Sequence, residues 1–394
     1  MEKKEVLVIG GGASGLMAAI TAARMGARVT VLEHNPAVGK KILATGNGRC
    51  NLTNVEERRD AYRCSDPAFP GAVLRQAAVS DTIRFFMELG IYTRNRDGWL
   101  YPYSNQAGSV VDVLLMEAAY RKVKIKTNAH IQLLAREAGR WTAVTEGWSY
   151  KGDAVILACG SRASQVPGAD GSGYTLANAL GHSIVKPLPA LVPLVCRGAD
   201  FAKWAGIRTE GVVRLLIQGA PVKEERGELQ LTNYGISGIP VFQLSRYAAR
   251  ALEEGCRVSL EIDFLPDFEK DQLKTFLQNR QERTPYKNQK ELLIGLFPDK
   301  LIPELLKQPH IIRGIKQFPL EVVRPQSFAH AQVCSGGIDV SQVCPDTLES
   351  RLHKGLYFAG EILDVDGACG GYNLQWAWSS GMVAGRHAAG GGAL

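Results

Sequence analysis

The chain has 394 residues, which is more than one hydrophobic core usually serves, so more than one domain is expected. Hydrophobic residues make up 45% and charged residues 22%, a globular composition that excludes a disordered, collagen-like or coiled-coil chain. The net charge of +7 is spread along the chain without a basic arm, which argues against a dedicated nucleic-acid binder. Glycine is in excess, at 42 residues where average usage would give about 28.

The first part of the chain has the pattern of a strand, a helix and a second strand. Val6–Ile9 is a short apolar run typical of a buried parallel strand, and residues 10–15 (GGGASG) follow it. Leu16–Met25 favours a helix, Ala27–Leu32 a second strand, and Glu33 ends that strand. The pattern also argues that this apolar segment is not a secretory signal peptide.

The glycines of this segment match the spacing G-x-G-x-x-G of dinucleotide-binding folds. Gly10 permits a tight turn, Gly12 lets the backbone approach a pyrophosphate, and Gly15 allows close packing of helix on strand. Glu33 lies where a carboxylate accepts hydrogen bonds from an adenosine ribose, and it disfavours a 2′-phosphate there. The pattern predicts a dinucleotide but does not distinguish FAD from NAD.

Two further segments carry a resemblance to a known family. Residues 39–54 (GKKILATGNGRCNLTN) and the C-terminal stretch 355–367 (GLYFAGEILDVDG) with 370–375 (GGYNLQ) look like motifs of the BaiN/aminoacetone-oxidase family of FAD-dependent oxidoreductases. The resemblance implies an α/β fold with a Rossmann-type FAD-binding domain in the two-dinucleotide-binding-motif flavoprotein layout. It also implies FAD as the cofactor.

The resemblance places the cofactor contacts in several segments. Asp153–Gly160 is predicted to be a buried strand that passes the adenosine side of FAD, and Glu361 is expected to hold the ribityl chain or the pyrophosphate. A final helix from about Asn373 to His387 is expected to point its N-terminus at the flavin, with backbone N–H donors from 373–375. The predicted cofactor-binding residues are Gly10, Gly12, Ala13, Ser14, Gly15, Glu33, Lys41, Gly46, Gly48, Arg49, Cys50, Ala158, Gly160, Gly360, Glu361, Gly371, Asn373, Leu374 and Gln375.

Three residues are candidates for catalysis. Arg49 is the candidate active-site cation, with a solvated surface arginine as the alternative. Tyr234 is a candidate acid, because Asn233 stands where the family usually has a histidine and an amide donates no proton at neutral pH. A packed tyrosine with a hydrogen-bonded hydroxyl is the alternative for Tyr234. Tyr372, at the start of the final helix, is the third candidate.

The middle of the chain has the composition of an inserted domain. Strands are predicted at Leu191–Val195, Gly211–Ile217 and Val258–Phe264, followed by helices at Glu269–Glu282 and Gln289–Leu306. We therefore expect a discontinuous FAD-binding domain at 1–186 and 326–394, an inserted β-rich domain on the substrate side at 187–265 and 315–325, and a helical subdomain at 266–314.

The predicted function is an FAD-dependent oxidoreductase with hydride transfer between flavin N5 and a small apolar or amphipathic substrate. The resemblance implies either reduction of a conjugated enone, such as a steroid-like bile-acid intermediate, or oxidation of a small amino ketone. The large insert suits a bulky substrate and therefore favours the reduction. Alternatives are an oxidase of a small amine or amino ketone, a tRNA-modifying flavoprotein and a non-enzymatic flavin sensor. NAD(P)H, if it is the electron donor, must bind without a Rossmann unit of its own, because a second strand–G-x-G-x-x-G–helix unit is missing from the insert.

Further expectations concern metals, thiols and location. The seven histidines and eight cysteines have no metal-ligand spacing and no close redox pair, so we expect no metal site and reduced thiols. No apolar run is long enough to predict a membrane span, and a cytoplasmic protein is expected. The oligomeric state is left open.

Overall fold

The structure is a computed structural model that describes residues 3–56, 58 and 60–391. The described residues form two compact units. The first unit holds the chain up to Pro187 and again from Val333 onward, and the second unit holds Leu188–Gln332. The first unit is therefore discontinuous in sequence.

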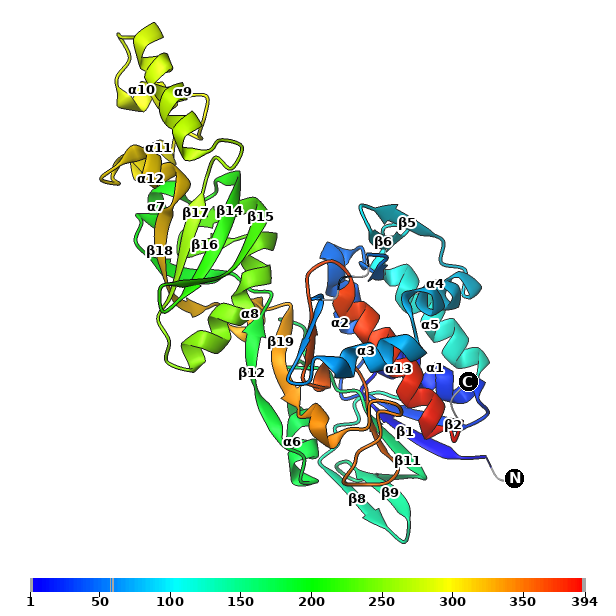
Figure 1. Ribbon diagram of the computed structural model, residues 1–394. Coiled ribbons are helices and arrows are strands. Elements are labelled where there is room, and N and C mark those ends of the chain that lie inside the picture. Colours follow the sequence, from blue (N-terminus) through cyan, green and yellow to red (C-terminus); the bar gives the residue numbers. More distant parts are fainter. Residues whose placement is uncertain (1–2, 57, 59, 392–394) are drawn as a thin grey trace. The chain divides into compact units, whose positions relative to one another are not determined.

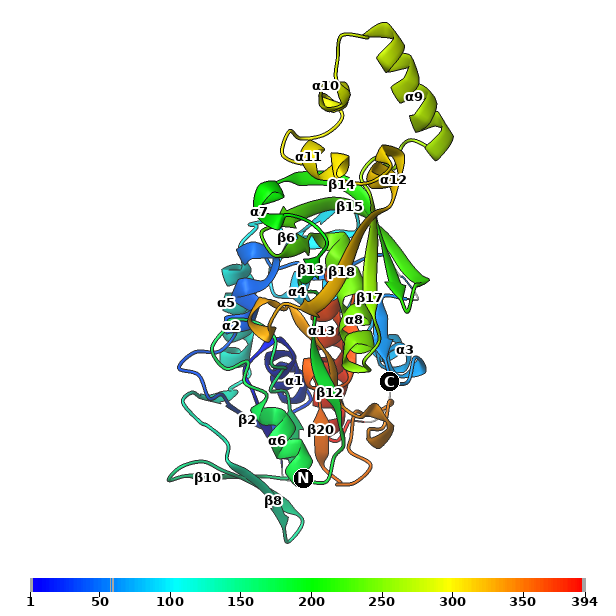
Figure 2. The same cartoon turned by 90° about the vertical axis from the view of Figure 1, so that its left-hand side faces the viewer.

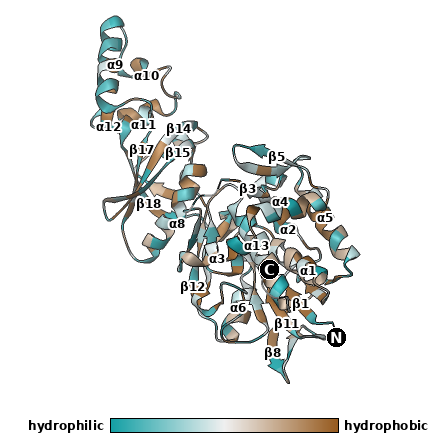
Figure 3. Ribbon diagram, turned by 45° about the vertical axis from the view of Figure 1, so that its right-hand side comes forward, coloured by the Kyte–Doolittle hydropathy of each residue, from teal (hydrophilic) through white to brown (hydrophobic). Residues whose placement is uncertain are grey.

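A parallel sheet forms the centre of the first unit, with the strand order β20-β11-β1-β2-β7 (Figure 1). Its strands are β1 (Glu5–Ile9), β2 (Arg28–Leu32), β7 (Lys124–Lys126), β11 (Ala154–Leu157) and β20 (Leu356–Phe358). All residues of β11 and all but the first of β1 are buried, and both strands have the hydrophobic colour in Figure 3. Apolar residues without alternation are what a strand covered on both faces requires.

Two helices of the first unit approach each other closely. In α13 (Tyr372–Ala388), a Cβ atom on Gly381 would lie 2.6 Å from the carbonyl oxygen of Ser14, and one on Gly385 would lie 2.4 Å from that of Ala18. Both carbonyls belong to α1 (Ala13–Arg24). Glycines one turn apart on α13 therefore let the two helix backbones pack together.

Smaller elements surround this centre. The helices are α2 (Lys40–Ala44), η1 (Thr45–Gly48), α3 (Ala68–Gln76), α4 (Val79–Glu88), α5 (Ala107–Tyr120), α6 (Ser172–Ala179), η3 (Val340–Gln342) and η4 (Gly360–Ile362). The additional strands are β3 (Thr53–Asn54), β4 (Tyr62–Cys64), β5 (Thr93–Arg96), β6 (Trp99–Pro102), β8 (Leu133–Glu137), β9 (Arg140–Val144), β10 (Ser149–Gly152), β12 (Ile184–Ala190), β19 (Val333–Ile338) and β21 (Val365–Gly367). They pair as β10-β9-β8, β3-β6-β5, β12-β19 and β21-β4.

The second unit is built on a closed barrel with the strand order β13-β16-β15-β14-β17-β18. Its strands are β13 (Leu194–Arg197), β14 (Arg208–Ile217), β15 (Ala220–Thr232), β16 (Gly235–Ser237), β17 (Val258–Asp263) and β18 (Phe318–Pro325). Residues alternate in and out: Val258, Leu260 and Ile262 of β17 are buried, and the residues between them are partly exposed. The unit also contains α7 (Phe201–Trp204), α8 (Ile239–Glu253) and η2 (Phe328–His330), and it has a hydrophobic core of its own.

Short helices extend from one end of this barrel. They are α9 (Lys270–Arg283), α10 (Gln289–Leu293), α11 (Ile302–Leu306) and α12 (Ile311–Lys316), and Figure 2 shows α9 and α10 beyond α11 and α12. The predicted helix Gln289–Leu306 is wrong, because Gly295 has a φ of +84° and Pro298 cannot continue a helix. The strand predicted at Leu191–Val195 begins only at Leu194, since Leu191 has a φ of +49°.

The predicted fold class is confirmed: an α/β fold with a parallel sheet, a β-rich part and a helical part. The predicted strand–helix–strand start corresponds to β1, α1 and β2. The helix begins at Ala13, three residues earlier than predicted, so residues 13–15 belong to its first turn.

Candidate functional site

Five of the predicted cofactor residues lie at one edge of the parallel sheet. Strands β1, β2, β11 and β20 run parallel and in register, with Ile9 opposite both Leu32 and Leu157. Their carboxyl ends therefore lie side by side. The residues that follow these ends are Gly10, Glu33, Ala158, and Ala359 with Gly360 and Glu361. Open α/β sheets bind their ligands at this edge.

The glycines after β1 differ in what surrounds them. A Cβ atom on Gly10, whose φ is +105°, would lie 2.5 Å from the carbonyl oxygen of Ala158. A Cβ atom on Gly15 would lie 1.9 Å from the carbonyl oxygen of Gly10. Gly12 has no protein atom within 4 Å of its Cβ position, and it precedes the first turn of α1. Gly10 and Gly15 thus fix the turn, whereas Gly12 leaves space beside the N–H groups of the helix.

Glu33 is buried at the end of β2 and is fully oriented by the backbone. One carboxylate oxygen accepts the Gly11 N–H at 2.7 Å, and the other accepts the backbone and side-chain N–H groups of Asn35 at 2.8 Å each. The carboxylate is therefore tied to the glycine loop itself. A carboxylate oxygen can accept about two hydrogen bonds, so the oxygen that accepts only the Gly11 N–H keeps capacity for a ribose hydroxyl.

Glu361, at the end of β20, joins three separate segments. Its carboxylate accepts from the Lys41 ammonium at 2.6 Å, the Ser161 hydroxyl at 2.7 Å and the Cys334 backbone N–H at 2.9 Å. Lys41 and Glu361 are 320 residues apart in sequence. Lys41 and Glu361, each predicted as a cofactor residue, thus form an ion pair. The pair keeps the Lys41 ammonium beside the carboxyl ends of the strands.

The first turn of α13 is anchored by Asn51 and Asn373. Gly371, with a φ of +96°, precedes the helix. With the Asn51 amide oriented to satisfy its hydrogen bonds, the Gly371 N–H donates to the Asn51 side-chain oxygen at 3.1 Å. The Asn373 side chain accepts the N–H of Gly367 and donates to the carbonyl of Gly367. The chain is thereby held at the entry to the helix.

The predicted donor role of Gln375 is not what the structure shows. Its backbone N–H donates to Gly371 O at 3.0 Å, because the helix begins at Tyr372, one residue earlier than predicted. Its buried side chain bonds to Thr53, Thr82 and Ser379. Within this helix the N–H groups that have no helical acceptor are those of the first turn, which includes Asn373 and Leu374.

The segment around Arg49 has unusual backbone geometry. Gly46, Asn47, Gly48 and Cys50 all have a φ between +54° and +81°. Arg49 is exposed, and within the described part of the chain its guanidinium makes no hydrogen bond or ion pair. Cys50 instead points inward and is buried. Such a strained loop with a free cation is typical of a ligand-binding segment.

The two candidate tyrosines lie in different environments. Tyr372 is buried, its hydroxyl donates to the carbonyl of Glu56 at 2.9 Å, and burial raises its pKa. Its edge-to-face contact with Tyr62 and the bond from the Tyr62 hydroxyl to the Tyr372 carbonyl hold it in place. Tyr234 is half-buried in the turn between β15 and β16 of the second unit.

The thiols near these segments are held in the protonated form. Burial raises the pKa of Cys50 and of Cys159 to about 12, and that of Cys334 to about 11. All eight cysteines are free. Across residues 3–56, 58 and 60–391, no group of three or more metal-ligating side chains comes together, and no helix is long and apolar enough to cross a membrane.

Several residues of this region were not predicted from the sequence. Ser161, Asn35 and Asn51 each bond to a predicted site residue, yet they belong to no motif that the spacing reveals. Asn51 lies within the segment 39–54 that carries the family resemblance, so its membership of the site could have been predicted from that segment. Ser161 follows Gly160 at the end of a predicted strand. This position indicated the carboxyl edge of the sheet but not the hydrogen bond to Glu361.

Comparison with known proteins identifies the family. A family model described as the HI0933-like protein Rossmann domain matches residues 4–387. The chain belongs to this family. The resemblance seen in the two sequence motifs is thereby confirmed, and so is the prediction of an oxidoreductase enzyme of the flavoprotein type.

Curated relatives span the whole chain. The chain is 46% identical to a 3-dehydro-bile acid delta(4,6)-reductase of Clostridium scindens, over 97% of this chain and 98% of the relative. It is 29% identical to a ribosomal RNA dihydrouridine synthase of Escherichia coli, over 96% of each chain. A Haemophilus influenzae protein of the same name is 30% identical, over 95% of this chain and 96% of the relative.

A solved structure supports the fold. The 3-ketosteroid delta1-dehydrogenase of Sterolibacterium denitrificans, in complex with 1,4-androstadiene-3,17-dione, matches with a TM-score of 0.53 and 12% identity. The match covers 99% of this chain and 100% of that one. At this identity the likeness concerns the fold alone.

Proposed function

We propose that the protein is an FAD-dependent reductase that adds two hydrogens across a C=C bond conjugated to a ketone in a steroid-like small molecule. The observation that carries this proposal is the 46% identity, over 97% of the chain, to a 3-dehydro-bile acid delta(4,6)-reductase. The sheet edge described above supplies the geometry that such an enzyme needs.

The residues present fit FAD. Gly12 has open space at its Cβ position next to the start of α1, where N–H groups and the helix dipole favour a pyrophosphate. Glu33 is buried at the neighbouring strand end with its carboxylate already oriented toward the loop. Gly160 and Gly48 also have no protein atom within 4 Å of their Cβ positions. The backbone can therefore approach a bulky cofactor at three separate loops.

Other residues of the chain hold charge around that cofactor. We propose that Lys41, fixed by Glu361, places its ammonium beside the phosphates or the ribityl chain. The N–H groups of Asn373 and Leu374 at the start of α13 favour negative charge by about 0.3–1 kcal/mol when exposed. FAD, when bound, supplies hydride transfer through N5 of its ring.

Arg49 is our candidate for binding the substrate ketone. The oxygen of an enone gains negative charge when its β-carbon accepts a hydride, and a positioned guanidinium stabilises that charge. Arg49 is exposed and makes no hydrogen bond or ion pair among the described residues, so its donors are available. Tyr234 stays a predicted proton donor. The Tyr372 hydroxyl already donates to a backbone carbonyl, and we assign Tyr372 a packing role.

A second candidate function rests on the RNA-modifying relatives. The chain is 29% and 30% identical to two ribosomal RNA dihydrouridine synthases over nearly its full length. Making dihydrouridine also saturates a C=C bond next to a carbonyl, so the same flavin chemistry serves both substrates. The substrate, rather than the reaction type, separates the two proposals.

The test uses holoenzyme that is reduced anaerobically with dithionite. We expect a 3-oxo-4,6-diene steroid to restore the oxidised flavin absorbance rapidly, while a saturated 3-oxo steroid of the same skeleton does not. A uridine-containing ribosomal RNA fragment is the third arm. Reoxidation by the RNA and not by the dienone would favour the second candidate, and reoxidation by oxygen alone would contradict both.

The electron donor and the location belong to the same proposal. We propose NAD(P)H as the donor, because the proposed reaction consumes reducing equivalents, and a cytoplasmic location. Reduction of the flavin by NADH or NADPH, followed anaerobically in a stopped-flow instrument, tests the donor independently of the substrate.

A further inference from the structure

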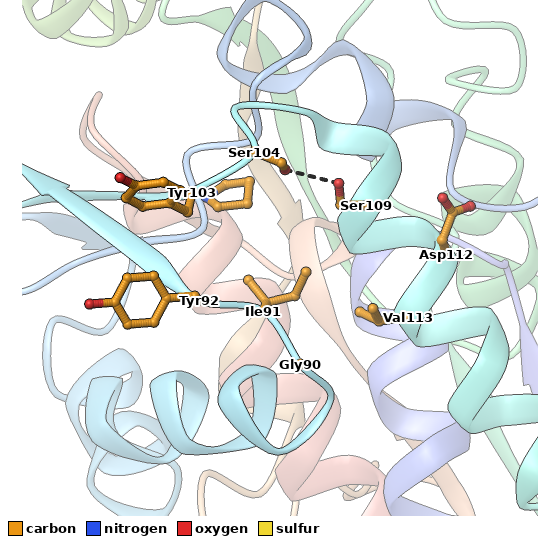
Figure 4. Close-up of a pocket in the computed structure, with 9 residues that line it drawn as sticks. Gly90, Ile91, Tyr92, Tyr103, Ser104, Ser109, Asp112 and Val113 are labelled. Atoms are coloured by element: carbon orange, nitrogen blue, oxygen red, sulfur yellow. Dashed lines mark hydrogen bonds between the residues drawn. The ribbon is translucent and has the colours of Figure 1, made fainter.

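The first unit contains a pocket that the proposed FAD site does not use (Figure 4). Its volume is about 380 Å³, within the range of small-molecule sites. The segment after α4 contributes Tyr92, the end of the β5–β6 hairpin contributes Tyr103 and Ser104, and α5 contributes Ser109 and Asp112. Figure 4 shows the two tyrosine rings on one side and the α5 residues on the other.

Two exposed aromatic rings form one wall. Tyr92 is 72% exposed and Tyr103 55% exposed, and their ring centroids are 5.6 Å apart at an angle of 52°. A backbone hydrogen bond of 2.8 Å from Tyr103 N–H to Tyr92 O keeps them adjacent. The ring of Tyr92 is largely uncovered, so it offers a face on which a planar base can stack.

A guanidinium stands next to this wall. Arg94 lies 4.4 Å from the centroid of the Tyr103 ring. Apart from this ring contact, Arg94 has no hydrogen-bond or ion-pair partner among the residues that the structure describes. Its planar donors suit the oxygens of a phosphate.

The opposite wall carries polar groups next to Val113. Asp112 is exposed and carries a carboxylate with no partner in the described chain, and the Ser104 and Ser109 hydroxyls bond to each other at 2.9 Å. A carboxylate accepts hydrogen bonds from the two hydroxyls of a ribose and disfavours a 2′-phosphate. Stacking face, guanidinium and carboxylate together match a nucleoside diphosphate.

The pocket is connected through the sheet to the start of α13. Strand β6, which leads into Tyr103, pairs with β3 through Leu100 and Thr53. A Cβ atom on Gly371 would lie 2.6 Å from the backbone of Thr53, so β3 in turn touches the entry to α13. This is the helix end that we place at the flavin.

We propose that this pocket binds the adenosine diphosphate half of NADH. The inference rests on the proposed function, in which a nicotinamide nucleotide is the electron donor, and it supplies the site that the sequence lacks as a second Rossmann unit. Tyr92 stacks on the adenine, Arg94 holds the diphosphate, and Asp112 accepts from the ribose. Because of Asp112, NADH binds more tightly than NADPH.

The experiment measures binding of NAD⁺, which cannot reduce the flavin, to the oxidised holoenzyme by calorimetry. It measures NADH binding from the dependence of the flavin reduction rate on NADH concentration. Tyr92→Ala and Arg94→Gln are each expected to raise the dissociation constant about tenfold. Asp112→Asn is expected to narrow the preference for NADH over NADPH. Tyr120→Ala is the matched control, because Tyr120 is 75% exposed on the same helix α5 with Arg121 over its ring.

Unchanged binding in Tyr92→Ala and Arg94→Gln would overturn the inference, as would equal loss in Tyr120→Ala. The inference would also be overturned, in favour of an RNA ligand, if Tyr92→Ala and Arg94→Gln weakened binding of a short uridine-rich RNA but left NADH binding unchanged. Reoxidation of dithionite-reduced enzyme by the dienone involves no NADH. Its failure therefore concerns the proposed function, and failure of NADH binding leaves the dienone result standing.

Discussion

Gly12 and Gly15 are three residues apart, yet substitution by alanine is expected to have different effects. Gly15→Ala places a Cβ atom 1.9 Å from Gly10 O, so we expect a loss of unfolding free energy of about 1–3 kcal/mol or more even without FAD. Gly12 has ordinary extended backbone, with a φ of −82°, and free space. Gly12→Ala should therefore fold normally.

Two measurements distinguish the variants: the affinity for FAD and the stability of the apoprotein. We expect Gly12→Ala to keep the melting temperature of the apoprotein and to bind FAD at least about tenfold more weakly, since its methyl group would fill the space that we propose for the pyrophosphate. Thermal melts of apoprotein and titration with FAD measure both. If Gly12→Ala bound FAD as tightly as the wild type, the placement of the pyrophosphate would be wrong.

His182 makes stability depend on pH. It is buried, with its Nε2 2.9 Å from the Ser350 hydroxyl, and burial, aided by nearby His353, lowers its pKa from 6.5 to about 4. Between these two values the unfolded chain takes up a proton that the folded chain does not, so stability is full above about pH 6.5 and falls as the pH drops toward 4.

Chemical denaturation across this pH range measures the effect. We expect a loss of up to about 3 kcal/mol between pH 6.5 and 4 attributable to His182, and a flatter profile in His182→Gln. His310→Gln, at an exposed histidine, should keep the wild-type slope. An unchanged slope in His182→Gln would contradict this assignment.

Helix α13 has a glycine with positive φ at each end, and the two ends are expected to respond differently. Gly371→Ala forces a φ of +96° on alanine and places its Cβ 2.6 Å from the Thr53 backbone. Gly390, beyond the other end, has a φ of +88° but only the Lys4 side chain nearby, at 3.8 Å. Gly390→Ala should lower the free energy of unfolding by about 1–2 kcal/mol, because only the backbone strain acts there. Gly371→Ala should lower it by clearly more, because the contact with Thr53 adds to the strain. Equal losses in denaturant titrations would show that the contact with β3 is not tight.

At the scale of elements, the sequence predicted strands whose formation depends on neighbouring residues, but not contacts between distant segments. Val6–Ile9 and Asp153–Gly160 were predictable as strands because an apolar run without polar alternation is typical of a buried parallel strand, although the second strand is observed only at Ala154–Leu157. The Lys41–Glu361 ion pair and the Asn51 contact with Gly371 join segments more than 300 residues apart, and no spacing rule reveals such partners. The helix error at 289–306 arose where Gly295 and Pro298 outweighed an otherwise helical composition.

The first turn of α13 shows a subtler limit. The motif located the start of the helix to within one residue. That one residue decides which backbone N–H groups lack an acceptor inside the helix. Gln375 N–H was expected to face the cofactor and instead closes the helix on Gly371. The pocket beside Tyr92 belonged to no motif at all, because its walls come from three elements that meet only in the folded chain.

At the scale of the whole molecule, the second unit is expected to fold alone. Leu188–Gln332 is one continuous segment, and its barrel closes on itself around its own core. A fragment of these residues should unfold cooperatively on heating, followed by circular dichroism. Leu260→Ala, at a buried position of β17, should lower its stability by about 2–5 kcal/mol. A fragment without a cooperative transition would show that the core depends on the rest of the chain.

The central claim is that this member of the HI0933-like family holds FAD at the carboxyl edge of its sheet and uses it to saturate a conjugated enone. The most direct test is a single turnover without oxygen, in which dithionite-reduced holoenzyme, freed of excess reductant, meets a limiting amount of a 3-oxo-4,6-diene steroid. We expect one steroid molecule heavier by two hydrogens for each flavin reoxidised. Reoxidation without a reduced steroid, or a purified protein that cannot be loaded with FAD, would contradict it.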